Sequence, residues 1–236
     1  MKSLLNPVLA AIILFLIAGV QSYGQKAEVE KRLKEYGIPE DFFVDNLKDE
    51  NAFHSFKTKT TSISDTITNV EVASFDPNLP DGKRWELLSY NGKEPTKKQQ
   101  KQFHKAHNES KEPENGEPND EDWQIVEDNE KNLIIGFRYQ EKNLPHKYKF
   151  LAECLGKVYI DKAGKQLEKV EFYSTAPLKI KIFNVQKLDM TEYYQFEEES
   201  GTYLVEKEES IMDVRLFGQN IEVKEIVEFY DYKKVR

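Results

Sequence analysis

The sequence predicts an α+β fold, with one large curved antiparallel sheet covered by N-terminal and inserted helices. The sheet is predicted by runs in which apolar and polar residues alternate, as half-buried strands require. Short turn signals separate most of these runs, which indicates antiparallel neighbours joined by hairpins. The helices are predicted by apolar residues at helical spacing before the strands, and by a capped polar helix that interrupts them. A curved sheet must either close or have its concave face covered.

Residues 1–24 are typical of a secretory signal peptide. Lys2 is followed by an apolar run from Val8 to Val20, and small residues lead up to Gly24. The run has about 13 residues, whereas a membrane-spanning helix needs roughly 20. We expect cleavage after Gly24, export to the periplasm or secretion, and one domain over 25–236. An uncleaved N-terminal anchor is the alternative interpretation.

The segment "KAEVEKRLKEYG" predicts a helix at the start of the mature chain. Val29, Leu33 and Tyr36 recur at helical spacing, and Gly37 ends the pattern. Pro39 and the acids after it favour the first turn of a second, short helix. These helices form the expected N-terminal cover of the sheet.

The strands that follow alternate with increasing clarity along the chain. "ISDTITNVEVASF" alternates only weakly, because Ile63 and Ile67 share one parity while Val70 and Val72 share the other. The alternation is stronger in "RWELLSY", "NLIIGFRYQ", "GKVYID" and "QLEKVEFYS". A turn over residues 161–164 joins the last two of these segments.

The last third of the sequence carries the strongest strand pattern. In "PLKIKIFNVQKLDM", Ile180 and Ile182 share one face, but Phe183 and Val185 break the parity, so we expect a bulge near Asn184. "EEESGTY" predicts a hairpin turn, after which "SIMDVRLFGQN" and "IEVKEIVEFYDY" predict two more strands. The charges in these strands, as in Glu206, Glu208 and Glu209, are interpreted as solvated strand backs and edge protection.

A charged helix-loop insertion is predicted at about residues 93–122, between two of the strands. Thr96 can cap a helix, and Gln99 lies three residues later in capping-box register. The helix that would follow, Lys97 to His107, is nearly all polar, with Phe103 its one large apolar residue. Since it buries little by itself, we expect it to lie as a flap on the sheet, followed by the exposed acidic loop "NESKEPENGEPNDED".

This order of elements, with "FLAECLGKVYIDKAGKQLEKVEFYS" and "PLKIKIFNVQKLDM", resembles the LolA/LolB-like lipoprotein-sorting carriers of the Gram-negative periplasm. The pattern "FDP…G.RW.LLS.NGK.PT" also resembles exported proteins of that superfamily. The resemblance extends over most of the mature chain, roughly from Ala52 to Tyr232. It implies a half-open barrel that is lidded by helices, with a hollow that holds acyl chains.

Composition and motifs argue against several other classes of function. The net charge of −8 disfavours nucleic acid as a partner, because phosphate backbones repel an acidic chain. No G-x-S-x-G, Walker A or H-E-x-x-H motif is present, so we expect no enzyme, no cofactor and no metal. His104 and His107 could supply two zinc ligands, but a solvated basic helix explains them better. Cys154, the single cysteine, lies among apolar residues and is interpreted as a buried structural thiol.

Two functions remain as the main alternatives. The first is a periplasmic carrier or sensor of a hydrophobic ligand, a lipid or an acylated protein, held in the hollow of the sheet. The second is a cell-envelope protein-interaction module with a packed core and no ligand cavity; a hydrolase has no positive support. For the first function, the alternating apolar positions predict a hollow lined by Trp85, Leu87, Ile135, Phe137, Val170, Phe172, Ile180, Ile182 and Met190.

Overall fold

The fold is taken from a computed structural model, which describes residues 25–38, 54–107, 118–144, 146–180, 183–199, 201–216 and 218–235. The predicted signal peptide, the short helix expected at Pro39, residues 108–117 of the acidic loop and Ile182 lie outside these ranges. Among the described helices, none has the length and apolar character that a membrane span needs.

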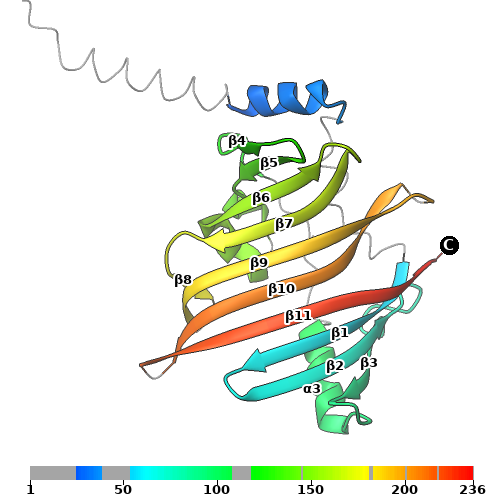
Figure 1. The fold of residues 1–236 in the computed structure, drawn as a ribbon. Coiled ribbons are helices and arrows are strands. Elements are labelled where there is room, and N and C mark those ends of the chain that lie inside the picture. The colour runs from blue at the N-terminus through cyan, green and yellow to red at the C-terminus, as the bar shows by residue number, and fades with distance from the viewer. Residues whose placement is uncertain are drawn as a thin grey trace, which may run out of the picture.

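One antiparallel sheet of eleven strands dominates the described chain (Figure 1). Its order is β3-β2-β1-β11-β10-β9-β7-β6-β5-β4, and β8 pairs with β9 beside this path. The sheet is open, with β3 and β4 as its edges, and it is neither closed nor strongly curled. The predicted α+β class with a large antiparallel sheet is therefore confirmed. The strands are β1 (His54–Ser64), β2 (Ile67–Phe75), β3 (Trp85–Tyr90), β4 (Gln124–Asp128), β5 (Asn132–Phe137), β6 (Cys154–Asp161), β7 (Gln166–Ser174), β8 (Leu178–Ile180), β9 (Phe183–Glu197), β10 (Thr202–Leu216) and β11 (Gln219–Lys234).

The weakly alternating early segment is a hairpin rather than one strand. β1 and β2 pair directly, with Ser64 opposite Ile67. Asp65 between them has a φ of 52°, a left-handed conformation that Asp tolerates in tight turns. The change of parity that the sequence shows lies inside β2, between Ile67 and Val70, so it does not mark this turn.

Two bulges adjust the longest strand pair. In the pairing of β9 with β10, Asp213 lies opposite Lys187 but Val214 lies opposite Val185, so Gln186 is an extra residue. The bulge predicted near Asn184 is thus present, two residues further on. A second bulge places Glu206 as the extra residue of β10. Such insertions bend a strand and change which of its residues face inward.

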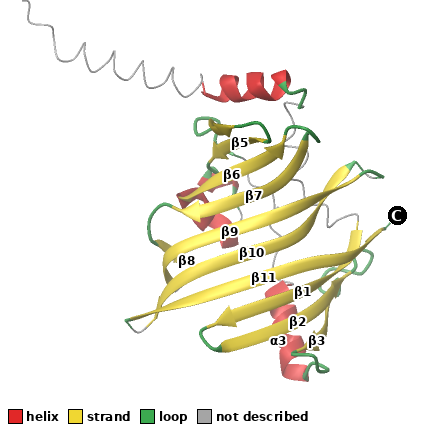
Figure 2. Ribbon diagram, viewed as in Figure 1, coloured by secondary structure: helices red, strands yellow, loops and turns green. Residues whose placement is uncertain are grey.

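Helices lie at both ends of the sheet (Figure 2). Helix 25–35 lies beyond the β4–β7 end, and Gly37, with a φ of 66°, follows it as a C-terminal stop. The inserted helix α3 (Lys97–His107) lies behind β1 and β2 in the view of Figure 1. The short 3-10 helices η2 (Glu141–Asn143) and η3 (His146–Glu153) lie behind β6, β7 and β9.

The capping box predicted for α3 is formed. The Gln99 backbone N–H donates to the Thr96 hydroxyl at 3.3 Å, and the Thr96 backbone N–H donates to the Gln99 side-chain oxygen at 2.8 Å. These bonds satisfy backbone donors that the first helical turn leaves free. The Gln100 side-chain amide also donates to the Leu87 carbonyl oxygen at 2.8 Å, which ties α3 to β3.

Buried apolar side chains form two separate clusters. The main core joins helix 25–35 and η3 to β4–β10, and it contains Leu33, Leu133 and Val158. The smaller cluster lies under α3 and joins Phe103 to Ala73 and Leu87. The middle strands of the sheet therefore run between two apolar regions.

Candidate ligand-binding face

The two clusters lie on one side of the sheet, which we call the inner face. Residues that pair directly on neighbouring strands point to the same side, so a register row traces one face across the molecule. One such row crosses nine strands, from the main core to the region of α3. In order it consists of Ile135, Val158, Val170, Glu192, Glu208, Val227, Thr60, Glu71 and Tyr90.

The β5–β9 part of the inner face is closely packed. Ile135, Phe137 and Val170 are at most 1% exposed, and the rings of Phe137 and Phe172 meet edge to face at 5.8 Å. Gly156 opposite Phe137 makes this possible, because a Cβ there would come within 2.6 Å of the ring. This region is a solid core.

The α3 end of the inner face is aromatic. The Trp85 ring lies 5.1 Å from that of Phe75 and 6.3 Å from that of Phe103 on α3. His107 stacks on Phe103 with ring centroids 4.0 Å apart. Trp85 is only partly buried, so part of this aromatic cluster stays accessible.

A cavity of about 490 Å³ lies between α3 and the sheet. Its volume is within the range of small-molecule pockets. Apolar lining comes from Phe103 and Ala106, while Glu71 and Tyr90, the last two residues of the register row, line its sheet side. The complete lining is Glu71, Tyr90, Thr96, Lys98, Gln99, Gln102, Phe103, Ala106 and His107.

The middle of the inner face carries two carboxylates side by side. Glu192 on β9 and Glu208 on β10 are direct cross-strand partners. The Tyr194 hydroxyl donates to Glu192 at 2.5 Å. A second, smaller cavity of about 70 Å³ is lined by both glutamates together with Met190, Ser210, Glu225 and Val227, and by Thr191 and Glu209.

The environment of this pair favours the protonated form. Burial and the nearby carboxylates of Glu192 and Glu225 raise the pKa of Glu208 to about 8. Burial also raises the pKa of Glu192, although the hydrogen bond from Tyr194 acts in the opposite direction. Two carboxylates at this spacing do not ionise independently, so the pair holds a proton at neutral pH.

The outer face of the sheet has a different character. Its glutamates have cations beside them: Glu228 lies 2.7 Å from Lys59, and Glu209 lies 3.3 Å from Lys207. Lys207 also lies over the Tyr193 ring. These are solvated surface pairs of the kind that add little stability, whereas the two buried apolar clusters lie on the inner face.

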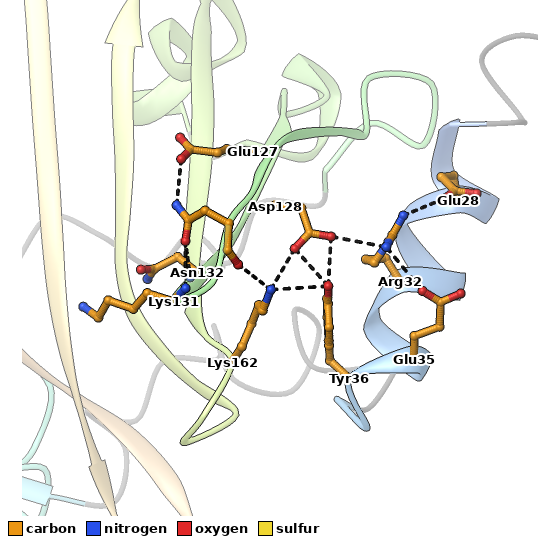
Figure 3. Close-up of polar contacts among 10 residues, drawn as sticks. Glu28, Arg32, Glu35, Tyr36, Glu127, Asp128, Lys131, Asn132 and Lys162 are labelled. Carbon is orange, nitrogen blue, oxygen red and sulfur yellow. Dashed lines mark hydrogen bonds and ion pairs between the residues drawn. The ribbon is translucent and has the colours of Figure 1, made fainter.

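A polar cluster fastens helix 25–35 to the sheet (Figure 3). The Tyr36 hydroxyl donates to the Asp128 carboxylate at 2.9 Å, and Lys162 and Arg32 lie 3.0 and 3.3 Å from the same carboxylate. Burial acts to raise the pKa of Asp128, but hydrogen bonds from Lys162 and Tyr36 outweigh it and lower that pKa. Asp128 thus ties the helix both to the end of β4 and to the β6–β7 turn.

Two further predictions concern single side chains. Cys154 is buried, as expected, and burial raises the pKa of its thiol to about 11, which leaves it unreactive at neutral pH. His104 and His107 lie on α3, where His107 contacts the Phe103 ring. Within the described ranges no three His, Cys, Asp or Glu side chains gather as a metal site requires.

The predicted hollow-lining residues divide between the two apolar regions. Trp85 and Leu87 belong to the aromatic end, and Ile182 lies outside the described residues. The others belong to the main core or pack against it, namely Ile135, Phe137, Val170, Phe172, Ile180 and Met190. The eight described residues belong to two apolar clusters rather than one, and contact of the predicted residues with a ligand stays a prediction.

Sequence reasoning missed the glutamate pair. It interpreted Glu208 as part of a solvated strand back, whereas the register places Glu208 on the inner face. The signal was present in β9: Leu188, Met190 and Tyr194 share one parity, and Glu192 is the charged residue within it. A charge in an otherwise apolar parity indicates an inward-facing carboxylate.

Comparisons with known proteins give matches of structure only. No family model matches the sequence, and no curated protein sequence matches it. A LolA superfamily protein from Nitrosomonas europaea aligns with 80% of this chain and 89% of its own, with a TM-score of 0.36 and 10% identity. A Vibrio parahaemolyticus domain, described as outer membrane lipoprotein-sorting, aligns with 90% of this chain and 93% of its own, with a TM-score of 0.38 and 10% identity. Both alignments extend over most of the chain, at low sequence identity.

Proposed function

We propose that this protein is a non-enzymatic carrier or sensor that binds a hydrophobic ligand on the inner face of its sheet. The ligand would be the acyl chain of a lipid or of an acylated protein. The observation that carries this proposal is the continuity of the inner face: one register row runs from the main core, past the smaller cavity, to the larger cavity under α3.

The half-buried side chains along this face suit an acyl chain. Met190, Met212 and Val223 are only partly buried where they pack against the main core, and Val227 lines the smaller cavity. Methionine side chains adapt to irregular apolar ligands. A ligand that covered these residues would remove their remaining apolar surface from water, which is favourable.

The packed β5–β9 region supports the second candidate, an envelope protein-interaction module. Ile135 and Phe137 are fully enclosed, so that part of the predicted hollow offers no space without rearrangement. We therefore assign the acyl chain to the part of the inner face from the smaller cavity to the cavity under α3. Among the predicted lining residues, Met190 lines the smaller cavity, and Trp85 and Leu87 belong to the apolar cluster under α3.

We further propose that the protein acts as a single domain in the periplasm after cleavage near Gly24. The short apolar run and the small residues before Gln25 support this. Intact-mass measurement of exported protein should give a chain that begins near Gln25. A mass that still includes Lys2 would contradict it.

A titration with a fluorescent fatty-acyl probe tests ligand binding. We expect saturable binding that unlabelled lipid displaces. Val227→Asn on the inner face should weaken binding of the probe at least about tenfold, because it places a polar amide against the acyl chain. The matched control is Ile226→Asn, the next residue of β11, which is also half-buried but faces outward. Equal loss in both variants, or no saturable binding by the unmutated protein, would leave the interaction module as the better account.

A further inference from the structure

The Glu192–Glu208 pair places two opposed carboxylates on the inner face, whereas the opposed acids Asp213 and Glu222 face outward. The two carboxylates belong to directly opposed positions of β9 and β10, where side chains lie about 5 Å apart at Cβ. They lie in the same row as Val158 and Val170, which are buried in the main core. Two acids therefore lie between apolar residues of this row, Val170 on one side and Val227 on the other.

No cation offsets their charge in the described part of the chain. The ion pairs of the sheet use outward-facing glutamates such as Glu209 and Glu228, and none includes Glu192 or Glu208. The groups that face the pair from neighbouring elements are hydroxyls and further acids: Tyr194 on β9, Tyr139 after β5, and Glu225 and Tyr232 on β11, with Glu71 on β2 beyond Glu225.

The arrangement leaves room for a ligand beside the pair. The cavity of about 70 Å³ that both glutamates line also has Met190 and Val227 in its wall. Tyr194 donates to Glu192, which stabilises a negative charge on that carboxylate and leaves the proton of the pair on Glu208. An acyl chain laid along the row would cover Glu208 and take water away from it.

We propose that protonation of the Glu192–Glu208 pair controls acyl binding, so that the ligand binds together with a proton and is released when the pair loses it. This inference rests on the proposed function. It assigns to the same face a release step that requires neither a nucleotide nor a second protein.

The sign of the effect follows from desolvation. Covering a carboxyl group with hydrocarbon disfavours its charged form, so the bound state holds protons more tightly than the free state. By linkage, affinity for the ligand then falls as pH rises through the titration of the pair, by at most about tenfold per pH unit for one proton. The raised pKa of Glu208, about 8, places this change near neutral and mildly alkaline pH.

The experiment measures the affinity of a fluorescent acyl ester at about pH 6, 7.5 and 9. The ester has no titratable group of its own, so any pH dependence belongs to the protein. For the unmutated protein we expect the dissociation constant to rise at least about fivefold between pH 7.5 and 9. Glu208→Gln should remove this rise, because glutamine stays neutral. Glu228→Gln, which changes an outward-facing glutamate of β11 that lines neither cavity, should keep it.

A second measurement needs no variant. Calorimetric titration of the unmutated protein with the same ester, in buffers of different ionisation enthalpy, reports protons taken up on binding. We expect uptake of a substantial fraction of one proton at pH 8. Binding with no proton uptake and no pH dependence would overturn this inference and leave the proposed function intact. No binding of the ester at any pH, including pH 6, would instead overturn the proposed function.

Discussion

At the scale of single residues, neighbouring glutamates of β10 have opposite environments. Glu209 faces outward beside Lys207, whereas Glu208 faces inward, next to Glu192. Their chemical type is the same, so the difference comes entirely from parity within the strand. The sequence shows which residues of a strand face inward only where apolar residues alternate with polar ones. In β10 the bulge at Glu206 interrupts this alternation two residues before Glu208. This is why Glu208 could not be assigned to the inner face from β10 alone.

Glu208 should make stability depend on pH. Its pKa is about 8 in the folded chain against an ordinary value of 4.5, so the folded state keeps a proton that the unfolded state loses. Stability should therefore fall as pH rises from about 4.5 to 8. Glu208→Gln should gain on the order of 1–3 kcal/mol at pH 8 relative to the unmutated protein, and little at pH 4.5. Urea unfolding at both pH values measures this, and an equal effect of Glu208→Gln at the two would contradict it.

At the scale of elements, local signals succeeded where side chains interact within a few residues. The Thr96–Gln99 capping box predicted the start of α3, and the hairpin turn between β9 and β10 was predicted from "EEESGTY". The β1–β2 turn was missed, because Asp65 and Thr66 are not one of the strong turn pairs. The polar cluster around Asp128 was also missed, since it joins residues of three distant segments.

Helix 25–35 should be attached mainly by its apolar side chains. Leu33→Ala removes a fully buried side chain of the main core and should cost about 2–5 kcal/mol. Asp128→Asn keeps the shape but loses charge and should cost less, on the order of 1 kcal/mol after discounting for its partial exposure. Because the folded pKa of Asp128 is lowered, its contribution is present at neutral pH and lost as pH falls through that pKa. Thermal unfolding checks both, with the exposed Lys31→Ala as the control; a larger loss for Asp128→Asn than for Leu33→Ala would refute this ranking.

The inserted helix α3 should open independently of the sheet. It buries one residue, Phe103, and its ties to β3 are few. Elements with little buried apolar surface open at low free energy. Hydrogen exchange should be fast in α3 and slow in β9 and β10, and Phe103→Ala should speed exchange in α3 without changing β9. Equal protection of α3 and β9 would contradict this, as would global unfolding of the Phe103→Ala variant.

At the scale of the whole molecule, the strand order was beyond sequence reasoning. β11, the last described strand, lies between β1 and β10, so the first and last strands of the sheet are neighbours near its centre. Alternation identifies strands but not their partners across long separations. That central placement determines the proposed site, because it sets Val227 beside Glu208 on one side and Thr60 on the other. The eight described lining residues belong to two apolar clusters, and whether they contact a ligand stays a prediction.

A ligand that lies along the inner face should contact residues of one strand parity only, and photo-crosslinking measures which residues it contacts. A diazirine-bearing acyl probe would be bound to the protein, illuminated, and its attachment sites located by mass spectrometry. We predict labels on Met212 and Val227 and on Phe103 in α3, with saturation by unlabelled lipid. The adjacent outward-facing residues Ile211 and Ile226 are the internal control, since they are half-buried like Met212 and Val227. Labels that fall on Ile211 and Ile226 as often as on Met212 and Val227, or labels that unlabelled lipid does not reduce, would contradict acyl binding on the inner face.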